Sequence, residues 1–177
     1  MIFEKMSPLD FRSLALVRIL LGFCIVIDLV VRASDLRAHY TDEGVLPRGA
    51  LLGDLLHSRW YYSFHYISGE PIFQGLLFLL AGVVAVGLIL GFRTRLCAIA
   101  SWLLLVSLHA RNPMVLNGGD TLLKMLLFWA MFLPLGRFWS VDSLYYERAE
   151  KVSYVSIAAF CFVLQLCIMY WLSLIHI

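Results

Sequence analysis

Two groups of polar residues lie within or beside apolar stretches of the chain and could do chemistry. The first is Asp28 with Arg32, followed one helical turn later by Asp35. Residues four apart share one face of a helix, so Asp28 and Arg32 can form an ion pair. Charged side chains within apolar segments are costly and need a partner or a function. The spacing allows two interpretations, an intrahelical pair at the end of a helix or a polar wall facing a cavity.

The second group is a denser polar run between His109 and Lys124. Pro113 should end the preceding helix, and Asn-Gly-Gly at 117–119 is typical of a tight turn with positive φ. Asp120 can cap the next helix and pair with Lys124 four residues later. This run is either a capped re-entrant turn or a polar site. If it is a site, the catalytic candidates are Asp28, Arg111, Asp120 and Lys124, and the substrate-binding candidates are Asn117, Gly118 and Gly119.

The remaining reactive residue types form no recognisable site. The cysteines lie in apolar segments without a CxxC pair, so we expect buried, inert thiols at Cys24, Cys97, Cys161 and Cys167. The histidines lack metal-ligand spacing, and the sequence therefore predicts no metal site. Nucleotide-binding and serine-hydrolase motifs are also missing from the sequence.

The composition indicates what must surround these residues. The 177-residue chain is 62% hydrophobic and only 15% charged, whereas soluble domains carry about 25% charged residues. Its net charge of +2, without a run of Lys or Arg, argues against a nucleic-acid partner. The lipid bilayer is the partner that this composition predicts.

Five apolar segments approach the length that a membrane helix needs, about 20 residues. They cover residues 14–31, 72–90, 96–108, 122–135 and 152–171. We therefore expect an all-α, polytopic transmembrane bundle of about five helices. The fourth segment is short, so it either continues through Pro134 to Trp139 or starts deeper, in a protein-lined cavity. The long connection after the first segment should contain an interfacial helix within residues 49–60.

The first segment carries its own start signals and one internal charge. Ser7 can act as N-cap, Pro8 suits the first helical position, and Asp10 places a carboxylate in the first turn. Arg18 should snorkel to the interface near the N-terminus. Lys and Arg near the helix ends favour a cytoplasmic N-terminus. They lie on that side at Lys5, Arg12, Arg93, Arg95, Arg137, Arg148 and Lys151, and on the other at Arg32, Arg37, Arg48, Arg59 and Arg111.

Several runs resemble the HTTM domain, a membrane domain shared with vitamin K-dependent gamma-carboxylase. They are Arg111-Asn-Pro-Met-Val-Leu-Asn-Gly-Gly-Asp120 and Pro134-Leu-Gly-Arg-Phe-Trp-Ser-Val-Asp142, together with residues 40–47 and 91–95. The resemblance covers most of the chain and points to bacterial members, which implies a multi-pass protein of a bacterial inner membrane. The turn at 91–95 also resembles DoxX-like small membrane proteins.

The resemblance implies a cavity for a quinone-like or lipid-soluble substrate. In the carboxylases a lysine just before the polar turn acts as the base in vitamin K oxygenation. Residues 111–116 contain no lysine here, Arg111 cannot deprotonate, and Lys124 follows the turn. The carboxylase histidine of that turn is replaced by Gly118 and Gly119. These departures argue against carboxylase activity.

Two functions stay open on these grounds. One is an enzyme acting on a lipid-soluble substrate, and its polar residues should converge on one pocket. The other is a non-catalytic membrane assembly module, or a DoxX-like redox subunit, serving a membrane or redox partner protein. We also expect a C-terminally truncated chain: residues 172–177 match the translation of a transposase sequencing adapter, so an HTTM-like domain over residues 1–171 would be followed by adapter read-through.

Overall fold

The computed structural model describes residues 9–55, 63–145, 153–154 and 156–175. Seven α-helices account for most of these residues, which confirms the predicted all-α class. They are α1 (Phe11–Ser34), α2 (Leu36–Tyr40), α3 (Arg48–Leu55), α4 (Pro71–Leu90), α5 (Thr94–Arg111), α6 (Gly118–Ala130) and α7 (Ile157–Ile175). Two-residue strands, β1 (Leu9–Asp10) and β2 (Ser153–Tyr154), pair antiparallel and join the start of α1 to the start of α7. Each of the five predicted apolar segments overlaps one of the longer helices.

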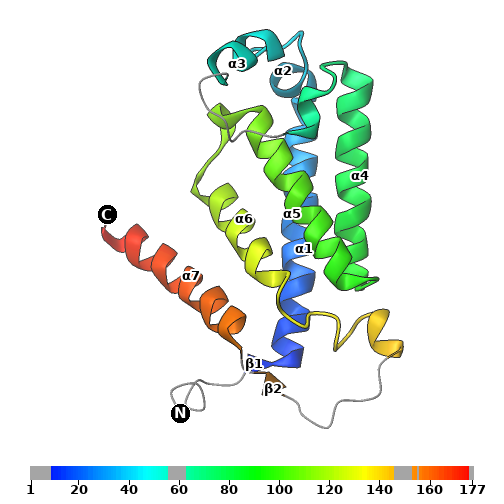
Figure 1. Ribbon diagram of the computed structural model, residues 1–177, viewed down its shortest axis with the longest axis vertical. Coiled ribbons are helices and arrows are strands. Elements are labelled where there is room, and N and C mark those ends of the chain that lie inside the picture. Colours follow the sequence, from blue (N-terminus) through cyan, green and yellow to red (C-terminus); the bar gives the residue numbers. More distant parts are fainter. Residues whose placement is uncertain (1–8, 56–62, 146–152, 155, 176–177) are drawn as a thin grey trace.

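Helices α1, α4 and α5 form the body of the molecule, in which α4 packs against both α1 and α5 (Figure 1). Gly22 allows α1 and α4 to approach closely, because a Cβ there would overlap Ile89 of α4. The helices α2 and α3 lie together at the end of the bundle where α1 finishes (Figure 1). The helix predicted within residues 49–60 is present as α3, and residues 56–60 of that prediction lie outside the described part.

The fourth predicted segment is the short helix α6, which begins lower in the bundle than the end of α5 (Figure 1). It has 13 residues and ends at Ala130, before Pro134. Continuation of the helix through Pro134 to Trp139 is therefore wrong, whereas a start deeper in a protein-lined cavity stays a prediction. Before α6, Pro113 opens a short 3₁₀ turn, Pro113–Val115.

The beginning of α1 differs from the sequence prediction in two details. Asp10 is the N-cap, and its side chain accepts a hydrogen bond from the Arg12 N–H; Ser7 and Pro8 lie outside the described residues. Arg18 does not snorkel, because its side chain is fully buried and donates to the Trp139 carbonyl. Gly91 (φ 72°) makes room for Arg18, since a Cβ at Gly91 would overlap Arg18 Nη1 and Ser140 Cβ.

The described surface carries many large apolar side chains, and several polar side chains are buried together with the apolar core. Large apolar side chains face outward, among them Val30 (66% exposed) on α1 and Ile72 (77%) on α4. The largest fully buried side chains include Arg18, Arg111, His65 and Gln74. Two helices, α1 and α4, are long and apolar enough to cross a membrane, and only 22% of the apolar window of α4 is buried inside the chain.

The cysteines also face outward to a greater extent than expected. All four are free thiols; Cys24 and Cys167 are exposed, whereas Cys97 and Cys161 are half-buried. The expectation of buried thiols was wrong because it took apolar segments to be the interior of the chain, and these segments place much of their apolar surface outside.

Candidate functional site

Asp28, Arg32 and Asp120 meet where the C-terminal part of α1 passes the start of α6. Arg32 lies at the centre of this cluster. Its Nε donates to both carboxylate oxygens of Asp28, at 2.8 and 2.9 Å, and its Nη2 donates to Asp120 Oδ1 at 2.6 Å.

 Arg32 and Asp120 are 88 residues apart in the chain, so the packing of α6 against α1, and not a local motif, brings them together.

Asp120 is held in place by the first turn of α6. Asn117 is the N-cap and accepts hydrogen bonds from the Gly119 and Asp120 N–H groups, while Asp120 Oδ2 accepts one from the Asn117 N–H at 2.8 Å. This reciprocal arrangement is a capping box, which satisfies helix-end donors that would otherwise be orphaned. It leaves Asp120 Oδ1 directed at Arg32.

The structure corrects three details of the predicted turn. The cap is Asn117, with Asp120 three residues inside the helix. Gly118 and Gly119 begin α6, and neither has a positive φ. Asp120 pairs with Arg32, and the ion pair with Lys124 predicted from their spacing is wrong. Asp120 uses one carboxylate oxygen to bind the Asn117 N–H and the other to bind Arg32 of α1, so its side chain does not point toward Lys124.

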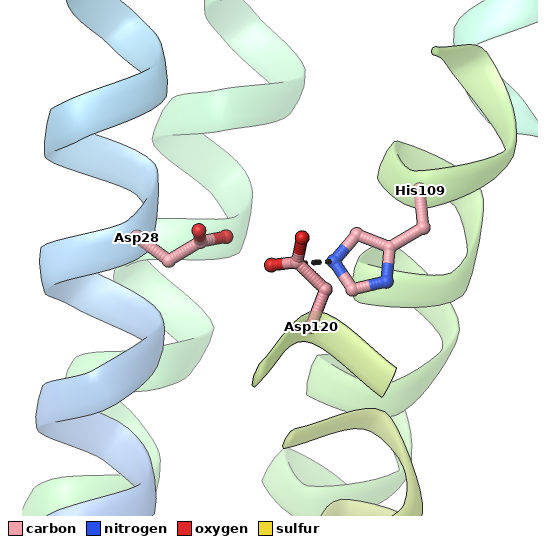
Figure 2. Close-up of side chains that lie close together, drawn as sticks. All are labelled: Asp28, His109 and Asp120. Carbon is pink, nitrogen blue, oxygen red and sulfur yellow. Dashed lines mark ion pairs between the residues drawn. The ribbon is translucent and has the colours of Figure 1, made fainter. Parts of the chain in front are cut away.

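His109, near the end of α5, faces the same carboxylate (Figure 2). Its Nε2 lies 3.9 Å from Asp120 Oδ1, which is too long for a hydrogen bond. The side chain is only 4% exposed, and neither ring nitrogen has a hydrogen-bond partner among the described residues. A buried polar group without a partner costs about 1–3 kcal/mol, so His109 is the least satisfied member of the cluster.

Tyr40, at the end of α2, completes the cluster and connects it to an apolar groove. Its hydroxyl accepts a hydrogen bond from Arg32 Nη1 at 3.0 Å, and burial raises the pKa of the phenol. Its ring packs edge-on against Phe78 of α4, with centroids 5.2 Å apart. Phe78 also lines a groove of about 620 Å³ between α1 and α4, with walls that include Leu29, Gly75 and Gly82.

Arg111 takes a different place from the one expected of a catalytic candidate. It is fully buried, and it donates to the Leu46 and Thr41 carbonyls at 2.9 and 3.1 Å. The neighbouring Asn112 donates to the His39 carbonyl at 3.1 Å. These bonds tie the end of α5 to the segment between α2 and α3, so Arg111 lies outside the Asp28 and Asp120 cluster and holds the backbone of a loop.

The other candidates lie at the margin of the cluster. Lys124 is half-buried on α6, and its charge is close enough to act on His109. Gly118 and Gly119 are exposed in the first turn of α6. Asn117 contributes by fixing Asp120. The structure thus brings Asp28 and Asp120 together and leaves Arg111 apart.

Two members of the cluster, His109 and Tyr40, are not among the candidates that the sequence predicts. His109 belongs only to the polar run, and Tyr40 only to the stretch at residues 40–47. A sequence signal did exist for His109, because it lies on the same polar turn as Asp120 and precedes a proline that returns the chain. Tyr40 carried no signal of its own, since its contact with Arg32 depends on how α2 folds over the end of α1.

The cluster combines groups that can bind charge with one that can carry a proton. With both aspartates ionised, Asp28, Asp120 and Arg32 carry a net charge of −1, shielded from bulk solvent by helices. Side-chain exposure is 20% for Asp28, 10% for Arg32 and 6% for Asp120. His109 offers a ring nitrogen that is free to accept or donate. Such a site can orient a polar group or hold a cation.

Comparison with known proteins adds no relative. The chain matches no family model, no curated protein and no solved structure.

Proposed function

We propose that the chain is a multi-pass membrane protein and that its buried charged cluster binds the polar head of a lipid-soluble, quinone-like molecule. The membrane part of the proposal rests on the outer surface of the helices. The helices α1 and α4 have mean hydropathies of 2.7 and 2.5 in their apolar windows. Large apolar side chains on α5 and α7 also face outward, among them Leu96 (58% exposed) and Ile157 (63%). Contact of this apolar surface with lipid carries no free-energy penalty, whereas its exposure to water is unfavourable.

The cluster of Asp28, Arg32, Asp120 and His109 is the observation that carries the functional proposal. Three apolar helices each contribute charged or polar side chains to one point inside the bundle. Ionisable residues at membrane depth are expensive and mark functional sites. The unpartnered His109 distinguishes this cluster from an ion pair that merely satisfies itself.

The groove between α1 and α4 supports a long, apolar ligand. It is lined almost entirely by apolar side chains, and it reaches Phe78, whose ring contacts Tyr40. Tyr40 in turn accepts the hydrogen bond from Arg32. An isoprenoid or acyl tail would fit the groove, and its polar head would then lie near the charged cluster. The resemblance to HTTM domains supports the same class of substrate.

One observation favours the second function, a non-catalytic assembly module for a membrane partner. Helix α7 slants away from α1, α4 and α5, and it packs mainly on α6 (Figure 1). Its outer face carries Tyr170 (72% exposed) and Trp171 (64%). A helix so placed can contact another membrane protein, and this module would need no ligand at the cluster.

Mass spectrometry of molecules that co-purify with the protein in detergent tests the first function. The wild type should retain a prenylquinone or a similar lipid. Gly82→Leu should lose the lipid, because Gly82 lines the groove and the leucine side chain would occupy it. The variant should still fold, since nothing lies within 4 Å of a Cβ at this position. His109→Ala should lose the lipid by removing a polar contact. Gly49→Leu, at another open and exposed position, is the matched control and should retain it.

Thermal unfolding of each variant separates loss of ligand from loss of fold. Retention of the lipid by folded Gly82→Leu and His109→Ala would contradict the proposed site. Absence of any lipid-soluble molecule from folded wild type would favour the assembly module.

A further inference from the structure

We propose that Asp28, His109 and Asp120 form a binding site for a divalent transition-metal ion. The three side chains come from α1, α5 and α6, and Figure 2 shows that they point toward one another. Each offers one ligand atom, and these atoms all lie within 4.8 Å of one another. The proposal goes beyond the lipid-binding function and does not depend on it.

The state of His109 is the independent observation that points to a ligand. The His109 side chain is only 4% exposed, and both ring nitrogens lack a hydrogen-bond partner among the described residues. The Nε2 atom is directed at Asp120 Oδ1 across 3.9 Å. An ion bonded to both atoms at about 2.0–2.2 Å would fit between them. Metal binding would therefore satisfy the histidine that the protein alone leaves unpaired.

The ligand set indicates the class of ion. One imidazole nitrogen and two carboxylate oxygens suit Zn²⁺, Mn²⁺ or Fe²⁺ better than a soft ion such as Cu⁺, which prefers sulfur. Three protein ligands leave a coordination position open for water or a substrate oxygen, as in catalytic sites.

Asn117 prepares Asp120 for this role. Its backbone N–H binds Asp120 Oδ2, which fixes the carboxylate and leaves Oδ1 facing His109 and Arg32. Hydrogen bonds of this kind orient metal ligands and contribute to metal affinity.

Arg32 competes with the ion for the same oxygens. Its guanidinium donates to both Asp28 oxygens and to Asp120 Oδ1, and it places a positive charge inside the cluster. Metal binding must displace Arg32 from Asp120, whereas its bonds to Asp28 and Tyr40 can persist in part. Arg32 therefore lowers the metal affinity of the site. Removal of Arg32 should tighten metal binding, and removal of His109 should weaken it.

Equilibrium dialysis of the full chain in detergent against Zn²⁺ tests the proposal, with bound metal measured by elemental analysis. Wild type should bind one Zn²⁺ per chain after treatment with a chelator. His109→Ala should weaken binding by at least about 100-fold, because even loss of an outer-shell partner costs about 10–100-fold. Arg32→Gln should tighten it by at least about tenfold, because it removes a like charge and frees the carboxylates.

Matched variants control for histidines, charges and the groove. His39→Ala removes a histidine outside the cluster, and Asp35→Asn removes an exposed acidic charge one turn beyond Arg32. Both should bind Zn²⁺ as the wild type does. Gly82→Leu should also keep its Zn²⁺, even if it loses lipid, so that failure of the two proposals can be told apart.

A second measurement uses Co²⁺ and excludes the free thiols. Co²⁺ held by nitrogen and oxygen should show visible d–d absorption without the near-ultraviolet band of a cobalt–thiolate bond. If His109→Ala does not fold, His109→Gln replaces it, because it keeps a hydrogen-bonding side chain but is a poor ligand. Equal Zn²⁺ affinity of wild type and a folded His109 variant, or weaker binding by folded Arg32→Gln, would overturn the proposal.

Discussion

His65, in the 3₁₀ turn Phe64–Tyr66, is a buried histidine that, unlike His109, has a hydrogen-bond partner for its ring. Its Nδ1 shares a hydrogen bond with Gln74 Oε1, and Gln74 Nε2 donates to the His65 carbonyl at 3.0 Å. This pair attaches the segment before α4 to the side of α4 itself. Burial lowers the pKa of His65 to about 4, against the opposing effect of the Gln74 hydrogen bond.

The first prediction is that stability falls on acidification between pH 6.5 and 4. The unfolded histidine has a pKa of about 6.5, so the unfolded state binds more protons than the folded state throughout this window. The stabilisation is complete above pH 6.5 and is lost as the pH falls toward 4. A shift of this size corresponds to up to about 3 kcal/mol. Unfolding of the protein in detergent, measured across this window, gives the dependence.

His65→Gln is the control for that prediction, because it cannot take up the proton. Its stability should vary less with pH than that of the wild type over the same window. Equal pH dependence of the two proteins would show that His65 does not control it. The carboxylate of Asp42 titrates separately: the Arg48 hydrogen bond lowers the pKa of Asp42 below 3.8, so its contribution is lost only at more acidic pH.

At the scale of elements, the turn between α4 and α5 brings three segments together around one glycine. Gly91 ends α4 with φ 72°, and Arg18 of α1 packs against it. On the far side, the Asp142 carboxylate accepts hydrogen bonds from the Arg93 and Thr94 N–H groups at 2.8 and 2.7 Å. Those bonds lower the pKa of Asp142 although burial opposes them. The turn therefore fixes both the start of α5 and the buried Arg18.

The second prediction is that Gly91→Ala is strongly destabilising. The left-handed conformation alone costs about 1–2 kcal/mol for a residue with a Cβ, and overlap with Arg18 and Ser140 adds to this cost. Gly82→Ala is the matched control, because Gly82 is helical and has open space at its Cβ. Thermal unfolding in detergent should show a large decrease for Gly91→Ala and little change for Gly82→Ala. Similar stability of the two variants would contradict the proposed strain.

Which elements the sequence could predict depends on how local their determinants are. The helices followed from apolar runs, and the Asp28–Arg32 pair followed from a spacing of four on one helix. The cap of α6 was placed three residues late, because Gly118 and Gly119 are typical of a turn and in fact begin a helix. The contacts of Arg18 with Trp139 and of Arg32 with Asp120 depend on packing between segments far apart in the chain. Such packing leaves no local pattern in a single sequence from which it could be predicted.

At the scale of the whole molecule, many large apolar side chains of the long helices face outward, although others form the core. The charged cluster lies inside, toward the end of the bundle where α1 finishes. The segment between α2 and α3 lies at this end, and the turn between α4 and α5 lies at the other (Figure 1). If the helices cross a bilayer, these two ends face opposite compartments, and the charged cluster lies nearer to one of them.

The last prediction concerns this orientation. Lys and Arg residues near helix ends favour the N-terminal side as cytoplasmic, so the segment between α2 and α3 should face outward. In a chain whose four native cysteines are replaced by serine, Glu43→Cys should react with a membrane-impermeant maleimide on intact cells. Tyr145→Cys should react only after the membrane is permeabilised. Both positions are exposed, with Tyr145 at 85%, so accessibility to the reagent should depend on the membrane alone.

The two labelling patterns also test whether the protein crosses the membrane at all. Reaction of both cysteines in intact cells would mean that the two ends of the bundle share a compartment, which a multi-pass arrangement does not allow. The reversed pattern would keep the crossing but invert the orientation, and the charged cluster would then lie nearer the cytoplasm. The expected pattern instead places Asp28, Asp120 and His109 nearer the outer side, where a lipid-soluble molecule or a metal ion would reach them without passing through the cytoplasm.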